Sequence, residues 1–267
     1  MDKIYLSIAG FNIVCVLKPT DHAYSKEKFK KMLWDNYREF ILKTPKKADF
    51  TIVIYSLGVL YFDIKQKSNL EEHYSLLFSI DKKRKKIHLH NPVNEFEFEF
   101  ILSYILNSYL LPINKGFSLH GSSVSYKDKA FIFEGVSGAG KSTTAALLNG
   151  LCTMLSDDSL IIRKKEGKFY AYQNLIHEKN WDFKRGPSAY SIDKVFFVKK
   201  AKTCGLKEIY NKEVVLNIFF KQIIGKEENL IKQFSAITEF VNENKFYYLY
   251  VKKDSGVLKK YFKKNIL

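Results

Sequence analysis

Cysteine, proline, tryptophan and arginine are all scarce in this chain of 267 residues. The three cysteines, Cys15, Cys152 and Cys204, are scattered, so they predict neither a metal-binding pair nor a disulfide framework. Long apolar runs are missing as well. The best candidate, residues 96–113, is interrupted by glutamate, asparagine and serine, which argues against a membrane-spanning helix. These absences lead us to expect a cytoplasmic globular protein without membrane contact.

The N-terminal stretch, MDKIYLSIAGFNIVCVLK, is apolar enough to be compared with a signal peptide. Gly10 and Asn12 break its apolar run, and no small-residue cleavage site follows. The stretch therefore predicts two strands that are joined at residues 10–12.

Basic residues are in excess, and the formal net charge is +16. Lysine supplies nearly all of it, with 40 lysines against four arginines, a bias that also fits an A+T-rich coding sequence. The basic runs KKADF, DKKRKKIH and KKYFKKN lie far apart and carry no nucleic-acid-binding motif. We expect a solvated basic surface and no nucleic-acid partner. Attraction to an acidic partner is the alternative.

The first third of the chain alternates apolar and polar residues in short runs, which predicts strands. These runs are KIYLSI, FNIVCVL, DFTIVIYS, YSLLFSI and KKIHLH. One amphipathic stretch, residues 25–43, predicts a helix among them. We expect a single domain over residues 1–267, in which a strand-rich part, 1–92, extends the sheet of a core, 93–267.

Residues 94–111 begin with alternating Phe and Glu, as a strand would. Asn94 followed by Glu97 is nevertheless typical of a helix N-terminus, and Pro112 supplies an end, so we predict a helix. Two strands follow in GFSLHGSSVSY and KAFIFEG, with a turn at residues 127–128.

The stretch EGVSGAGKSTTAALLNG, residues 134–150, contains the full pattern G-x-x-x-x-G-K-[ST]. An apolar strand precedes it and a short helix follows it, which is the context of a phosphate-binding loop. The glycines allow backbone N–H groups to surround phosphates, and the start of the helix adds its positive end. Lys141 would reach the β- and γ-phosphates, and the Ser142 hydroxyl would bind Mg²⁺. The predicted nucleotide-binding residues are Gly135, Ser137, Gly138, Ala139, Gly140, Lys141, Ser142 and Thr143.

A second informative stretch, LSDDSLIIR, ends an apolar run with Asp157 and Asp158. A metal-binding acid lies at such a position, at the end of a strand. The short distance from Lys141 leaves room for one helix only, which is tighter than in most GTPases and ABC-type ATPases. Neither the Asn-Lys-x-Asp element nor the Leu-Ser-Gly-Gly-Gln signature of those families is present. A third stretch, SLHGSS, places His120 at the end of a strand that leads toward the loop.

The three elements LHGSSV, FEGVSGAGKST and LSDDSLIIR, in this order and spacing, closely resemble the HPr kinase/phosphorylase-like superfamily, which includes ATP-dependent phosphoenolpyruvate carboxykinases. The nearer resemblance is to its small divergent kinases, including those encoded beside peptide-modification systems. The resemblance extends over most of the chain, through DKVFFVKK, NKEVVLNIFFKQII and KFYYLYVKK. It implies an α/β P-loop kinase with a mixed central sheet, flanking helices and a strand-rich N-terminal extension.

The resemblance also implies roles for single residues. Lys141 and Ser142 take phosphate and Mg²⁺ roles, Asp158 becomes a metal ligand, and Asp157 becomes the general base. The two aspartates can also be assigned the other way round. His120 would lie near the γ-phosphate, where it orients the acid or stabilises charge. Phosphoryl transfer needs mainly positioning and charge neutralisation, and these residues supply both.

The sequence also departs from the family. No counterpart of the C-terminal signature of true HPr kinase/phosphorylases is visible, so neither HPr as substrate nor a phosphorylase activity is expected. The residues that bind oxaloacetate in carboxykinases are not recognisable either. Lys184 and Arg185 are the remaining candidates for neutralising the transferred phosphate, and a solvated loop explains them equally well.

We expect a kinase that uses ATP and Mg²⁺ to phosphorylate a hydroxyl, with serine in a peptide, a protein or the free amino acid as the acceptor. The alternative is a nucleotide-binding regulatory or assembly protein without a substrate of its own. The presence of His120, Asp157 and Asp158 together favours chemistry, because binding alone would need only the loop and one acid. The identity of the acceptor, the phosphoryl donor and the oligomeric state stay open.

Overall fold

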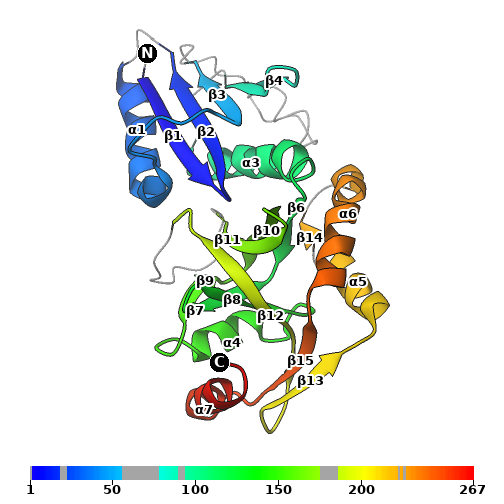
Figure 1. The fold of residues 1–267 in the computed structure, drawn as a ribbon. Helices are drawn as coiled ribbons and strands as arrows, with labels where there is room; N and C mark the ends of the chain where they lie inside the picture. Colours follow the sequence, from blue (N-terminus) through cyan, green and yellow to red (C-terminus); the bar gives the residue numbers. More distant parts are fainter. Residues whose placement is uncertain are drawn as a thin grey trace, which may run out of the picture. The chain divides into compact units, whose positions relative to one another are not determined.

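The computed structural model describes residues 2–18, 23–55, 78–89, 94–174, 186–221, 223–224 and 227–267. The chain divides into two compact units, Met1–Ile105 and Leu106–Leu267. Both units combine helices with a sheet of mixed strand direction, which confirms an α/β fold (Figure 1). None of the described helices is both long enough and apolar enough to cross a membrane.

The first unit contains a five-stranded sheet in the order β1-β2-β3-β5-β4. The β2–β3 and β3–β5 pairs are parallel, and the two outer pairs are antiparallel. The elements are β1 (Asp2–Ile8), β2 (Phe11–Leu17), α1 (Ala23–Tyr37), the 3-10 turn η1 (Arg38–Phe40), β3 (Phe50–Ile54), β4 (Phe78–Asp81), β5 (Lys86–Leu89) and α3 (Glu95–Ile105).

Helices α1 and α3 meet through aromatic side chains. The ring of Phe98 on α3 lies 5.4 Å from Phe29 and 5.7 Å from Tyr37 on α1. The start of α3 is a reciprocal cap: Asn94 N–H donates to Glu97 Oε2 at 2.9 Å, and Glu97 N–H donates to Asn94 Oδ1 at 2.9 Å. The predicted helix N-terminus is therefore confirmed. The helix predicted over 25–43 ends earlier, because the α-helix stops at Tyr37.

The expectation that the N-terminal strands extend the sheet of the loop-bearing core is wrong. Strands β1 to β5 pair only with one another among the described residues, and they close a sheet of their own. Its buried residues include Leu6, Ile13 and Ile52, each with no exposed surface. These strands therefore have a core within the first unit and do not need the larger sheet to cover them.

The second unit contains a larger sheet, in which ten strands are described. Its elements are the π-helical turn η2 (Leu106–Leu110), β6 (Gly116–His120), β7 (Ser122–Tyr126), β8 (Lys129–Glu134), α4 (Lys141–Leu147), β9 (Thr153–Ser156), β10 (Ser159–Lys165), β11 (Lys168–Gln173), β12 (Ala189–Lys200), β13 (Gly205–Ile209), α5 (Lys212–Phe220), β14 (Ile223–Ile224), α6 (Glu227–Glu243), β15 (Phe246–Val251) and α7 (Ser255–Asn265).

The order of the larger sheet is β14-β6-β10-β11-β12-β8-β7-β9, and β15 pairs with the C-terminal half of β12. Strands β8, β12 and β15 run parallel, whereas the other pairs are antiparallel. Helices α5 and α6 cover one face through Phe219 and Phe240, and α4 and α7 cover the other through Ala145 and Phe262. The C-terminal ends of three parallel strands therefore lie together beside the start of α4.

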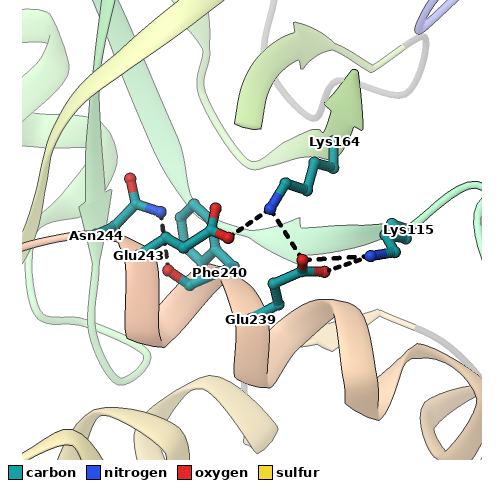
Figure 2. Close-up of polar contacts among 6 residues, drawn as sticks. All are labelled: Lys115, Lys164, Glu239, Phe240, Glu243 and Asn244. Carbon is teal, nitrogen blue, oxygen red and sulfur yellow. Dashed lines mark hydrogen bonds and ion pairs between the residues drawn. The ribbon is translucent and has the colours of Figure 1, made fainter. Parts of the chain in front are cut away.

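A network of charges joins α6 to the sheet of the second unit (Figure 2). Lys164 on β10 donates to Glu239 at 2.9 Å and also to Glu243, and Lys115 lies 3.1 Å from the second oxygen of Glu239. These contacts raise the pKa of Lys164, with Glu243 the larger cause, and lower the pKa of Glu239, with Lys164 the larger cause. Lys164 and Glu239 therefore each stabilise the charged form of the other.

Candidate functional site

Two pairs of strands change direction at the same level of the larger sheet. His120, the last residue of β6, pairs with Ser159 on β10, and Ser123 on β7 pairs with Ser156 on β9. Gly121 alone separates β6 from β7, and residues 157–158 separate β9 from β10. The coincidence of the two breaks brings His120 beside Asp158, with Nδ1 3.2 Å from Oδ1.

The two aspartates differ in exposure. Asp158 retains 22% of its side-chain surface, and His120 retains 38%. Asp157 is only 3% exposed, and its backbone carbonyl accepts a hydrogen bond of 2.6 Å from the Ser122 hydroxyl. Adjacent residues at the end of a strand point in different directions, so only one of the two carboxylates is directed outward.

The break after His120 requires glycine. A Cβ atom on Gly121 would lie 2.1 Å from Oε1 of Glu134, the last residue of β8. Glu134 has no exposed surface, and neither of its carboxylate oxygens has a hydrogen-bond partner among the described residues. Burial raises the pKa of Glu134 well above its usual range, although the positive charge of Lys141 opposes this shift. The buried carboxyl group of Glu134 therefore lies next to Gly121, the residue that follows His120.

The loop between β8 and α4 depends on three glycines with positive φ. These angles are 142° at Gly135, 75° at Gly138 and 99° at Gly140, which side chains with a Cβ atom rarely allow. Helix α4 begins at Lys141, whose side chain turns back so that Nζ donates to the Gly135 carbonyl at 2.9 Å. Lys141 is 7% exposed, so the loop folds around a nearly buried ammonium group.

A pocket of about 620 Å³ opens over this loop, and we call it the loop pocket. Residues 137–144 form its floor, and His120 and Asp158 line it on one side. Of the residues predicted to form the site, the pocket brings together His120, Ser137, Gly138, Ala139, Gly140, Lys141, Ser142, Thr143 and Asp158. Gly135 and Asp157 are not among its lining residues.

The structure adds residues that sequence reasoning missed. The far side of the loop pocket is lined by Val198 and Lys200 from β12 and by Val251 and Lys253 from the end of β15. The sequence contains a signal for them, because the same three letters, Val-Lys-Lys, close β12 and begin at the last residue of β15. No sequence pattern indicated that Glu134 would be buried beside the site. Lys184 and Arg185, which were considered for phosphate neutralisation, lie outside the described residues.

No protein-only metal cage is present in the described part of the chain, where no three His, Cys, Asp or Glu side chains gather around one point. The groups that line the loop pocket include the hydroxyl oxygen of Ser142 and the carboxylate oxygens of Asp158. Such oxygens suit Mg²⁺, which usually takes one or two carboxylates and keeps waters and phosphate oxygens as its other ligands.

Comparisons with known proteins give structural likeness at a distance and no match in sequence. No known protein family and no curated protein matches the sequence. Among solved structures, the Hpr(Ser) kinase/phosphatase from Coxiella burnetii is similar over 50% of this chain and 84% of its own length, at 6% identity and a TM-score of 0.28. These values do not establish membership of a family.

Proposed function

We propose that this protein is an ATP-dependent kinase that transfers the γ-phosphate to a hydroxyl group, with serine in a peptide, a protein or the free amino acid as the expected acceptor. One observation carries the proposal: the glycine loop, Lys141 and the His120–Asp158 pair all line a single pocket. A pocket of about 620 Å³ lies within the range that small-molecule sites occupy.

Lys141 and the loop would bind the phosphates of ATP. Positive φ angles at Gly138 and Gly140 turn the backbone inward without side chains that would block the approach of a phosphate. The Lys141 ammonium group is held at the base of the loop by the Gly135 carbonyl. A nucleotide would give this nearly buried cation a stronger anionic partner than a carbonyl oxygen.

We assign the general base to Asp158 and its orientation to His120. A base must contact the acceptor hydroxyl, and Asp158 lines the pocket whereas Asp157 is buried behind it. His120 Nδ1 lies 3.2 Å from Asp158 Oδ1, so the imidazole can fix the carboxylate as it accepts the proton. This is the second of the two arrangements that the sequence left open.

Ser142 would then hold Mg²⁺ from within the pocket, and Asp157, which does not line the pocket, would act on the ion through water only. Because Mg²⁺ keeps several waters, a carboxylate that lies behind the pocket wall can act on it through water. When bound, the ion would neutralise charge on the β- and γ-phosphates.

The proposal is tested by following labelled γ-phosphate from ATP into serine and into serine-containing peptides. A kinase labels at least one acceptor in a reaction that requires Mg²⁺. If the protein binds Mg-ATP tightly but labels nothing across a broad panel of hydroxyl compounds, the regulatory or assembly function replaces the kinase.

A further inference from the structure

Two parallel strands of the larger sheet end in lysines that face the loop pocket. Lys200 is the last residue of β12, and Lys253 follows β15 by two residues. Both line the pocket. The side chain of Lys200 extends across the loop, because its Cε atom lies 4.0 Å from the place that a Cβ atom on Gly140 would take.

The lysines that precede Lys200 and Lys253 in the sequence make contacts outside the pocket. Lys199 lies over the ring of Tyr248, with Nζ 5.4 Å from the ring centroid, and Lys252 lies 3.8 Å from Asp254. Neither Lys199 nor Lys252 lines the pocket. In each Val-Lys-Lys ending, therefore, the second lysine turns toward the pocket and the first does not.

The strand order divides the loop pocket into two sides. Strand β8, which leads into the loop, pairs with β7 on one side and with β12 on the other. His120 lies on the β7 side, because Gly121 alone separates it from Ser122 of β7, which pairs with Phe133 near the end of β8. Its own strand, β6, follows β12, β11 and β10 in the sheet, so this placement depends on the Gly121 corner and not on the strand order. Lys200 and Lys253 belong to the opposite side, because β15 pairs with β12.

The inference that follows rests on the proposed function. If the pocket binds ATP, its two sides determine which end of the nucleotide lies where. In an in-line transfer the acceptor hydroxyl approaches the γ-phosphate opposite the β-phosphate. The base Asp158 must therefore lie at the γ-phosphate end. The remainder of the nucleotide extends across the loop toward β12 and β15.

We propose that Lys200 and Lys253 bind the α- and β-phosphates of the donor, and that its ribose and base lie over Val198, Ala201 and Val251. Charge supports this assignment: Lys141, Lys200 and Lys253 are the cations that line the pocket, and Asp158 is the acid among its described lining residues. Such a lining complements a polyanion. The apolar side chains on the same side give the nucleoside a surface without competing charges.

The test compares four variants with equal loss of charge. Lys200→Met and Lys253→Met remove a pocket cation but keep an apolar stem, and Lys199→Met and Lys252→Met remove the neighbouring cation as matched controls. Isothermal titration calorimetry with Mg-ATP and with Mg-ADP measures the affinity of each variant. Lys141→Ala and the wild type are included, and thermal melting confirms that every variant is folded.

We expect each pocket variant to lose about tenfold in affinity, the value of one charge-assisted contact. The affinity for ATP and the affinity for ADP should fall by the same factor, because both nucleotides contain the α- and β-phosphates. The controls should bind as the wild type does.

Equal affinities in pocket variants and controls would overturn this inference and leave the kinase proposal standing. A loss for ATP without a loss for ADP would also overturn it, because the lysines would then lie at the γ-phosphate. If the wild-type protein binds neither ATP nor ADP, the proposed function is wrong, and this inference is wrong with it.

Discussion

The imidazole of His120 is joined to the carboxylate of Asp158, with 3.2 Å between Nδ1 and Oδ1, although the two residues belong to different strand pairs. The contact exists because the chain breaks twice at one level of the sheet, at Gly121 and at residues 157–158. This contact distinguishes Asp158 from the adjacent Asp157, whereas the sequence alone left the roles of the two aspartates interchangeable. Only the acid that His120 contacts faces the loop pocket.

The first prediction distinguishes the two acids. Asp158→Asn keeps the shape of the side chain and removes the proton acceptor, so phosphoryl transfer should fall by about 10²–10⁴ while Mg-ATP affinity survives. Asp157→Asn should instead weaken the response of ATP affinity to Mg²⁺. Single-turnover assays and titrations with and without Mg²⁺ measure both effects. If Asp158→Asn abolishes the Mg²⁺ response and Asp157→Asn abolishes transfer, the two roles are exchanged.

The second prediction concerns Lys141. Lys141→Ala removes the cation that the loop surrounds, and binding of ATP should be lost together with turnover. Lys168→Ala, at an exposed position at the start of β11, serves as the control for net charge and should leave both intact. Calorimetry that gives Lys141→Ala the affinity of the wild type would show that this loop does not bind the phosphates.

The third prediction follows from the close approach of Gly121 and Glu134. Gly121→Ala would place a Cβ atom 2.1 Å from a Glu134 carboxylate oxygen, so either the buried Glu134 carboxyl or the corner at residue 121 must move. Overpacking of this kind costs about 1–3 kcal/mol. Urea unfolding should show this loss, and transfer should fall too, because His120 shifts with the corner. In a Glu134→Ala background the same substitution should cost less, as a double-mutant cycle would measure; equal costs would contradict the contact.

The fourth prediction concerns the pH dependence of stability at Glu134. Burial raises the pKa of this carboxyl in the folded protein, so the folded state binds a proton that the unfolded state has released. The stability of the wild type relative to Glu134→Gln should therefore be highest below the unfolded pKa of about 4.3 and should fall as the pH rises toward the folded pKa. Urea unfolding of both proteins from pH 4 to pH 8 measures the difference. A difference that does not change with pH would mean that Glu134 is charged throughout.

The features that the sequence predicts most directly are local ones. The glycine loop, the cap of α3 and the tight turn at residues 127–128 each depend on residues that are close in the chain. Long-range pairing decided the rest. Lys200 and Lys253 reach the pocket only because β12 and β15 pair in parallel beside β8, and a lone Val-Lys-Lys ending does not reveal its neighbours.

Burial was equally hard to predict. Glu134 is polar in the sequence, yet it is enclosed, because Gly121, between β6 and β7, leaves space for it. The separate sheet of the first unit was missed for a related reason. Alternating strands show which face is apolar, but they do not show whether their partners come from the same unit.

The last prediction concerns the charge network between α6 and the sheet. The pKa of Glu239 is lowered, so the stabilisation it gives is present above its ordinary value of about 4.3 and is lost as the pH falls through the lowered value. The pKa of Lys164 is raised, so its contribution is present below about 10.4 and is lost as the pH rises through the raised value. The network should therefore contribute between these limits and weaken beyond both.

Glu239→Gln tests the network, because Glu239 contacts both Lys115 and Lys164. Its matched control is Glu208→Gln in the same unit, where the carboxylate lies 3.9 Å from a single lysine. Urea unfolding at pH 7 should show a larger loss for Glu239→Gln than for the control. The excess should shrink in 1 M salt, where the Debye length is about 3 Å, and should disappear at a pH low enough to protonate Glu239 in the wild type. An excess that persists under acid would mean that α6 is held by packing around Phe240, and not by charge.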